Sequence, residues 1–191
     1  MHKQLKIGID IDGVLRDMFG SYLRVIKKNY PDYLKSDICY SYDFSNIDLP
    51  YKKKLDILFN EFPKEIFLDS KPISGAIENY EILKNWAEEN EHQLVCATSQ
   101  EERLIHFTYS WLGKYNLNFK ELYITNEKEK LPLDYLIDDS PENYKKWIKY
   151  GNAEEKFIIV DATYNQDIKA TNRIFRLSEA IDILKNKDGN K

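Results

Sequence analysis

From Pro72 onward, short apolar runs alternate with longer stretches whose apolar residues recur at helical spacing. The short runs predict buried strands, and the longer stretches predict amphipathic helices. The predicted strands cover residues 93–98, 122–125, 135–139 and 157–161, and the predicted helices cover 73–89, 103–115 and a stretch that begins at Ser140-Pro141. With a further apolar strand at 5–12, this alternation predicts an α/β fold, a Rossmann-like parallel sheet covered by helices on both faces.

Residues 18–70 interrupt this pattern between the first strand and the alternating region. Helical spacing is found around residues 23–26 and again at 51–59, and no strand is evident. We therefore predict a core made of residues 1–17 and 71–191, with a small helical unit of residues 18–70 inserted after the first strand. The unit is rich in aromatic side chains, which either form its own small core or line a pocket for a flat ring.

Composition narrows the class of protein. A chain of 191 residues can form one good core with a small insertion. Hydrophobic residues make up 42% and charged residues 31%, as in ordinary globular proteins. There is no apolar run of about 18 residues, as a membrane span requires, and no signal-peptide pattern, so a cytoplasmic protein is expected.

Charge and cysteine content exclude further classes. The net charge of −4 argues against a large nucleic-acid interface, but a small phosphorylated substrate fits if a bound metal reverses the local charge. Cys39 and Cys96 are far apart in the sequence, so neither a disulfide framework nor a zinc site is predicted. Nothing in the sequence indicates an oligomeric state.

The first strand ends in two aspartates, Asp10 and Asp12, followed by Gly13. Side chains alternate along a strand, so both carboxylates are expected to begin on the same side of the chain. Unpaired carboxylates repel one another and resist burial. A hard cation such as Mg²⁺ would neutralise both, which makes this stretch a candidate metal site.

Two other predicted strands also end in polar residues, one at Thr98-Ser99 and one at Asp138-Asp139. Ligands of parallel sheets bind beyond the carboxyl ends of the strands, where these side chains would meet Asp10 and Asp12. Adjacent residues of a strand point in opposite directions, so one of the paired aspartates can ligate a metal directly while the other orients a neighbour. We favour Asp139 as the ligand.

This set of residues fits the hydrolysis of a phosphate monoester. Asp10 would attack phosphorus, and Asp12 would act as general acid and then general base. Mg²⁺ would bridge Asp10, a backbone carbonyl near Asp12 and one of the paired aspartates. Thr98 would hold a phosphoryl oxygen through its hydroxyl, with the backbone N–H of Ser99 assisting at a helix start. The positive charge would come from Lys128 or Lys130.

The order of these residues resembles the four motifs of the haloacid dehalogenase (HAD) superfamily, over almost the whole chain. Asp10-x-Asp12-Gly13-Val14-Leu15 is similar to the first motif, Thr98 to the second, a lysine to the third and Asp138-Asp139 to the fourth. The resemblance implies a phosphatase with an aspartyl-phosphate intermediate, and it identifies residues 18–70 with the helical cap of that superfamily.

Within the superfamily, the chain resembles the 5′(3′)-deoxyribonucleotidases. The segments that carry this resemblance are Asp10–Asp17, Pro72–Ala76, Cys96–Ser99, Thr125–Lys128, Leu136–Asp139 and Asp161–Asn165. The resemblance favours Lys128 over Lys130 and implies a nucleoside monophosphate substrate. Gln100 and Thr163 replace prolines of the family pattern, and Arg16 stands where a small residue is usual. Arg16 either meets a second charged group of the substrate or caps the acidic cluster.

Three other functions share some of these features. A sugar phosphatase would keep the chemistry and change the substrate, which the helical unit would select. A phosphatase of nucleic-acid ends would need a basic surface that the sequence does not show. A binding module on the same scaffold needs none of the catalytic residue types, yet all of them are present.

Overall fold

The computed structural model describes residues 3–36, 38 and 41–188. Six parallel strands form one sheet in the order β3-β2-β1-β4-β5-β6, which confirms the α/β class. The strands are β1 (Lys6–Ile9), β2 (Gln93–Thr98), β3 (Leu122–Ile124), β4 (Tyr135–Asp138), β5 (Phe157–Val160) and β6 (Asn172–Ile174). Because β1 lies between β2 and β4, the three strands that carry the candidate residues are neighbours at the point where the strand order reverses.

The strand predictions need two corrections. The first strand ends at Ile9 and not at residue 12, so Asp10 follows the strand and Asp12 lies in the turn beyond it. The sequence reading also missed β6 at the edge of the sheet. Asn172-Arg173-Ile174 offers only one buried residue, too few to give an alternating pattern.

Six α-helices are described. They are α1 (Met18–Asn29), α2 (Tyr51–Asp56), α3 (Ala76–Glu89), α4 (Ile105–Lys114), α5 (Pro141–Tyr150) and α6 (Ala180–Asp188). Two of them begin later than predicted. Ile73 is bonded through its N–H to Leu15 O, and Gly75 has φ +74°, so α3 starts at Ala76. A single 3₁₀ turn, Glu102–Leu104, precedes α4.

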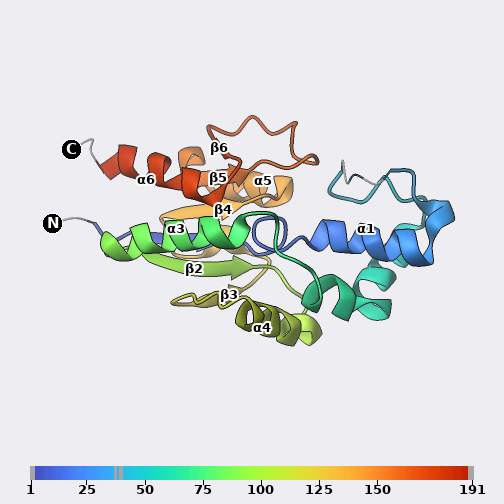
Figure 1. Cartoon of the computed structure of the whole chain (residues 1–191). Helices are drawn as coiled ribbons and strands as arrows, with labels where there is room; N and C mark the ends of the chain where they lie inside the picture. Colours follow the sequence, from blue (N-terminus) through green and yellow to red (C-terminus); the bar gives the residue numbers. More distant parts are fainter. Residues whose placement is uncertain (1–2, 37, 39–40, 189–191) are drawn as a thin grey trace.

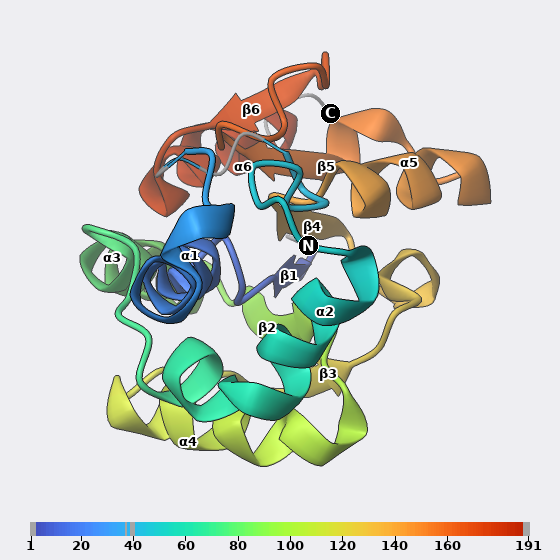
Figure 2. The same cartoon turned by 90° about the vertical axis from the view of Figure 1, so that its right-hand side faces the viewer.

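Side chains on the two faces of the sheet enter different hydrophobic clusters, as the period of two along a strand requires. Ile7, Ile137 and Ile158 pack on one face with residues of α3, α4 and α6. Leu136 and Ile159 point to the other face, where Trp147 of α5 covers them. Figure 2, which looks towards the carboxyl ends of the strands, shows α3 and α5 on opposite sides of the sheet.

Helices occupy most of residues 18–70 and lie beyond the carboxyl ends of the strands, to the right in Figure 1, while both termini lie at the other end. After α2 the chain continues as two π-helical segments, Ile57–Glu61 and Lys64–Leu68. The segment has a hydrophobic cluster of its own, which includes Tyr22, Phe44 and Ile57 and also receives Leu104 from the core. Its limits at 18 and 70 stay a prediction.

The structure bears on the predictions for the cysteines and for membrane-spanning segments. Cys96 is buried in β2, as expected for a small apolar side chain. Cys39 lies outside the described residues. None of the helices in the described part of the chain is long and apolar enough to cross a membrane.

Candidate active site

The site is built at the carboxyl end of β1. The N–H of Asp10 still bonds to Ile137 O of β4 at 3.0 Å, so its backbone is fixed against the neighbouring strand. Its carboxylate is held at both oxygens: Oδ1 accepts from the N–H of Ile11 at 2.7 Å, and Oδ2 lies 2.8 Å from Lys128 Nζ. A buried carboxylate oriented in this way is a suitable nucleophile.

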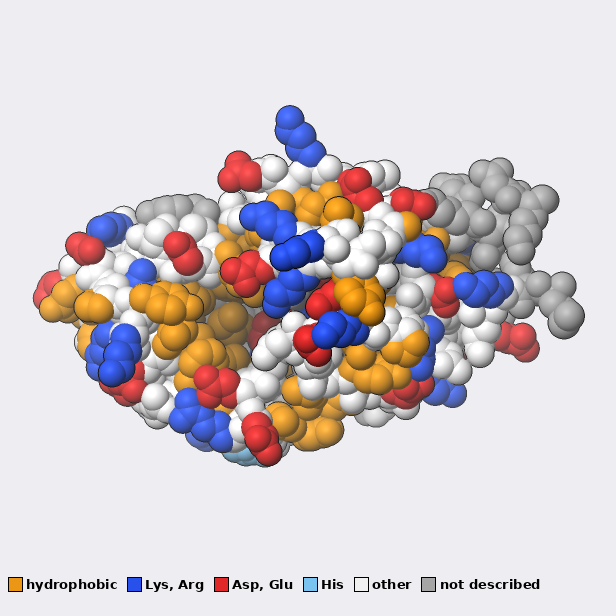
Figure 3. Space-filling model, turned by 180° about the vertical axis from the view of Figure 1, so that it is seen from behind, with side chains coloured by type: hydrophobic (Ala, Val, Ile, Leu, Met, Phe, Trp, Pro, Cys, Tyr) orange, Lys and Arg blue, Asp and Glu red, His pale blue; other side chains and the backbone are white. Residues whose placement is uncertain are grey.

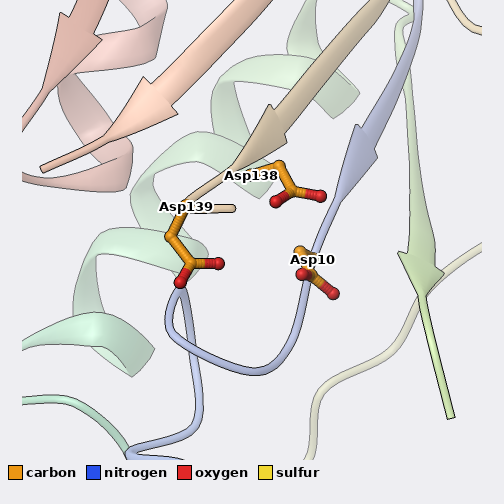
Figure 4. A group of neighbouring side chains, drawn as sticks. All are labelled: Asp10, Asp138 and Asp139. Atoms are coloured by element: carbon orange, nitrogen blue, oxygen red, sulfur yellow. The ribbon is translucent and has the colours of Figure 1, made fainter. Parts of the chain in front are cut away.

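Three carboxylates converge at this point. Asp10, Asp138 and Asp139 each offer an oxygen, and the three oxygens lie within 4.8 Å of one another. Figure 4 shows Asp10 at the end of β1 facing the paired aspartates at the end of β4. All three residues are buried. Because buried like charges repel, the cluster needs positive charge to remain ionised.

Lys128 supplies part of that charge. Its Nζ lies 2.8 Å from Asp10 Oδ2 and 2.7 Å from Asp138 Oδ2, and the side chain is only 1% exposed. Lys130, the other candidate of the sequence analysis, lies at the surface and pairs with Glu127. The structure therefore places Lys128, and not Lys130, in the site.

One lysine does not balance three carboxylates. Burial, and then the charges of Asp138 and Asp12, raise the pKa of Asp10 to about 7, against the lowering effect of Lys128. Burial and the carboxylates of Asp138 and Asp10 also hold the pKa of Asp139 well above its usual range. A site of buried oxygen donors with excess negative charge fits a hard divalent cation such as Mg²⁺.

The two adjacent aspartates have different partners. Asp138 is saturated, since it accepts from Lys128 Nζ, from the N–H of Ser140 at 2.8 Å and from Asn143 Nδ2 at 2.9 Å. Asp139 accepts from the hydroxyl of Tyr164 through Oδ2. Asp139 therefore has more free acceptor capacity, which suits it to hold a metal while Asp138 orients the lysine.

Gly13 makes room for this arrangement. A Cβ at this position would lie 2.0 Å from Asp139 Oδ2, and the residue has φ +82°, a conformation that L side chains rarely adopt. The glycine thus serves both the turn after β1 and the close approach of Asp139.

Asp12 does not join the carboxylate cluster, although it lines the same cavity as Asp10. Its two oxygens accept from Arg16 Nε at 2.7 Å and from Arg16 Nη2 at 2.8 Å. The strand ends at Ile9, so the turn, and not strand alternation, sets the direction of Asp12. Its backbone carbonyl remains a candidate metal ligand. Arg16 therefore pairs with Asp12 and not with the three clustered carboxylates.

Thr98 and Ser99 are placed differently from each other. The hydroxyl of Thr98 is buried, lines the site and has no hydrogen-bond partner among the described residues, so it is free to donate to a ligand. Ser99 is not at a helix start, because the chain does not turn until Glu102. Its hydroxyl donates to Thr125 O at 3.0 Å, so its side chain ties β2 to the loop after β3.

A cavity of about 450 Å³ opens from these residues towards the helical segment. Asp10, Asp12, Thr98 and Lys128 lie along one side of it. The lining residues from the helical segment are largely apolar and aromatic, and besides Asp43 they are Met18, Phe19, Tyr42, Phe44, Tyr51, Leu55, Leu58, Phe59 and Phe67. Figure 3 shows the hollow on the back of the molecule, bordered by hydrophobic side chains on the side of the helical segment.

Sequence reasoning did not assign a role to several supporting residues. Asn165 Nδ2 donates to Asp139 O and to Val160 O, both at 2.8 Å, so it fixes the backbone of Asp139. Tyr164 and Asn143 orient the two aspartates directly. Tyr164 and Asn165 lie in a segment that carries the family resemblance, which was the one available signal. Asn143 follows Ser140 within the first turn of α5, a position that the predicted N-cap allows one to locate.

Comparison with known proteins agrees with this geometry. The model of the family described as "5′ nucleotidase, deoxy (pyrimidine), cytosolic type C protein" matches residues 3–188. The mitochondrial 5′(3′)-deoxyribonucleotidases of Mus musculus and Homo sapiens are each 24% identical over 150 residues. These alignments cover 73% of this chain and 66% and 64% of the mouse and human proteins, so the chain spans about two thirds of the length of these relatives.

Solved structures show the same fold. A haloacid dehalogenase-like family hydrolase from Streptococcus pneumoniae superposes with a TM-score of 0.62 at 14% identity, over 96% of this chain and 100% of the other. The carboxylate cluster with its buried lysine, the strand order and the family match agree with one another. The chain belongs to the 5′ nucleotidase, deoxy (pyrimidine), cytosolic type C family, and its fold is that of haloacid dehalogenase-like hydrolases.

Proposed function

We propose that the protein is a Mg²⁺-dependent 5′-nucleotidase that hydrolyses deoxyribonucleoside or ribonucleoside monophosphates. One observation carries this proposal: the carboxylate and lysine centre opens into a cavity that is also lined by aromatic side chains of the helical segment. One nucleotide could place its phosphate at Asp10 and its flat base among these rings. A cytoplasmic location is part of the proposal.

The residues divide the reaction into two steps. In the first step, the Asp10 carboxylate attacks phosphorus, the bond from phosphorus to the ester oxygen breaks, and Asp12 donates a proton to the leaving oxygen. In the second step, Asp12 takes a proton from a water molecule that attacks the aspartyl-phosphate, which releases inorganic phosphate and restores Asp10. Lys128 and the hydroxyl of Thr98 offer positive charge and a hydrogen bond to the phosphoryl oxygens.

The metal would be held by Asp10, Asp139 and the backbone carbonyl of Asp12, with Asp138 as an orienting residue. When bound, Mg²⁺ offsets the negative charge shared by the carboxylates and the phosphoryl group. The burial of the carboxylates and their raised pKa values support this assignment.

The size and lining of the cavity favour a nucleotide over a smaller sugar phosphate. Its volume of about 450 Å³ lies within the range of small-molecule sites. Phe59 and Phe67 stand parallel to each other, 4° apart in plane and with centroids separated by 6.2 Å, and both line the cavity. A sugar phosphate would leave this aromatic surface uncovered.

The deciding experiment is phosphate release from a panel of nucleoside monophosphates and sugar phosphates, with Mg²⁺ and with EDTA. We expect kcat/KM to be highest for nucleoside monophosphates and activity to disappear in EDTA. Phe59→Ala should raise KM for nucleotides by about tenfold, the loss of one stacking contact of about 1.4 kcal/mol. For a small alkyl phosphate, KM should not change. Release from sugar phosphates alone would refute the nucleotidase proposal and retain the mechanism.

The raised pKa values predict how metal binding depends on pH. The pKa of Asp10 is about 7 in the fold against 3.8 in the unfolded chain, so the metal-free protein should lose stability as pH rises through this range. Mg²⁺ competes with protons and should raise Tm more at pH 8 than at pH 5. One pKa unit corresponds to about 1.4 kcal/mol, or about 3–6 °C for a chain of this size. Thermal melts at both pH values measure the difference, and an equal Mg²⁺ effect at both would contradict it.

A further inference from the structure

Arg16 is a fully buried arginine to which the two reaction steps assign no role. Its guanidinium makes two parallel bonds to the carboxylate of Asp12 and donates through Nη1 to Phe67 O at 2.8 Å. It also lies between two aromatic rings, 5.3 Å from the centroid of Phe67 and 5.4 Å from that of Trp111. A planar group held by a carboxylate, a carbonyl and two rings has little freedom to move.

We propose that Arg16 is a positioning residue that fixes the Asp12 carboxylate for proton transfer to the leaving oxygen. The inference deepens the proposed function and rests on it, because it assumes that Asp12 acts on the ester oxygen. Asp12 lies in the turn after β1, and Arg16 is the one residue that the described structure shows bonded to its carboxylate oxygens. Without that partner, the backbone of the turn alone would set the direction of the carboxylate.

Arg16 is connected to two residues that line the cavity, Phe67 and Gln100. Phe67 belongs to the helical segment and lines the cavity. On the other side, Arg16 Nη2 lies 3.5 Å from Thr108 Oγ1, which lies 3.5 Å from Gln100 Oε1. Gln100 also lines the cavity, and its buried Nε2 has no hydrogen-bond partner. Two residues that depart from the family pattern, Arg16 and Gln100, are therefore joined through Thr108.

The alternative is that the pair of Arg16 and Asp12 only stabilises the fold. The two roles differ in what they do to the reaction. A stabilising pair affects Tm and affects all substrates alike. A positioning residue affects kcat mainly for substrates whose leaving oxygen must receive a proton.

The test is therefore the dependence on the leaving group. Arg16→Met keeps the length of the side chain and removes the guanidinium. We expect kcat for a nucleoside monophosphate to fall about 100-fold, the lower end of the contribution of a general acid. With p-nitrophenyl phosphate, whose leaving group departs as a stable anion, the fall should be less than about fivefold. KM should change little for both substrates.

Two further variants secure the interpretation. In an Asp12→Asn background, Arg16→Met should change kcat by less than about threefold, because residues that act as a unit are not additive. Arg16→Lys keeps the charge but cannot make the two paired bonds to Asp12, so we expect it to show the same substrate dependence. This variant replaces Arg16→Met in the test if Arg16→Met does not fold. Thermal melts of each variant establish that it is folded.

The outcomes separate the inference from the function on which it rests. Equal losses with both substrates, or an unchanged kcat in folded Arg16→Met or Arg16→Lys, overturn the positioning role and leave the nucleotidase intact. A wild-type protein that hydrolyses only p-nitrophenyl phosphate overturns the proposed function itself.

Discussion

Replacing Asp10 with asparagine should abolish turnover while leaving the protein folded. The variant removes the attacking oxygen, and loss of a nucleophile that works with other groups costs about 10⁴-fold or more in kcat. The same change removes a buried carboxylate whose ionisation burial opposes. We therefore expect the Tm of metal-free Asp10→Asn at pH 8 to equal or exceed that of the metal-free wild type. Phosphate release and rapid-quench detection of a phosphorylated protein measure activity, and thermal melts measure stability.

Asp43→Asn is the matched control for this variant. Asp43 also lines the cavity, but its carboxylate bonds to Ser41 and Ser45 within the helical segment. It lies outside the carboxylate cluster, so kcat should stay within about threefold of the wild type. An active Asp10→Asn protein, or a phosphorylated intermediate that persists in it, would assign the nucleophile to another residue.

Replacing Lys128 with methionine should weaken both stability and catalysis. The variant leaves Asp10 and Asp138 buried without the cation that lies within 2.8 Å of each. Removing one partner of a buried ion pair lowers the free energy of unfolding by about 3–5 kcal/mol. The loss should be smaller at pH 5, where the raised pKa of Asp10 lets this carboxylate take up a proton. Loss of a charge that faces the phosphoryl group should also lower kcat by about 10²–10³-fold.

Lys130→Met provides the comparison for Lys128→Met. Lys130 is two residues away, lies at the surface and pairs with Glu127. An exposed pair of this kind contributes little, so stability should change by less than about 0.5 kcal/mol and activity should not change. Urea unfolding and phosphate-release assays check both variants. If Lys130→Met loses activity and Lys128→Met does not, the assignment of the motif lysine is reversed.

The core of the site could be predicted because buried parallel strands are apolar and end abruptly in polar residues. Asp10, Thr98 and Asp138 each mark the end of such a run, and the strand order brings the three ends together. The start of α5 could also be predicted from Ser140-Pro141, and in the structure the Ser140 side chain accepts from the N–H of Asn143. These features depend on local sequence and on a general property of parallel sheets.

Other features depend on contacts between distant segments and could not be read from local patterns. The direction of Asp12 follows from a turn that begins earlier than the apolar run suggests. The partners of Arg16 come from Phe67 and Trp111, which no spacing rule connects to it. Ser99 was misplaced because the chain stays extended up to Glu102, although a polar strand end usually leads directly into a helix.

The pairing of the central strands also bears on how the protein folds. Ile9 of β1 pairs with Cys96 of β2 and with Ile137 of β4, partners that are far from it in sequence. Such distant pairings form late, because closing a long loop costs entropy before the strand contacts can stabilise the chain. The carboxylates therefore meet only when the sheet is almost complete, and the unfolded chain has no site for the metal. We expect bound Mg²⁺ to slow unfolding and to leave the folding rate unchanged, so that the ion extends the lifetime of the native state.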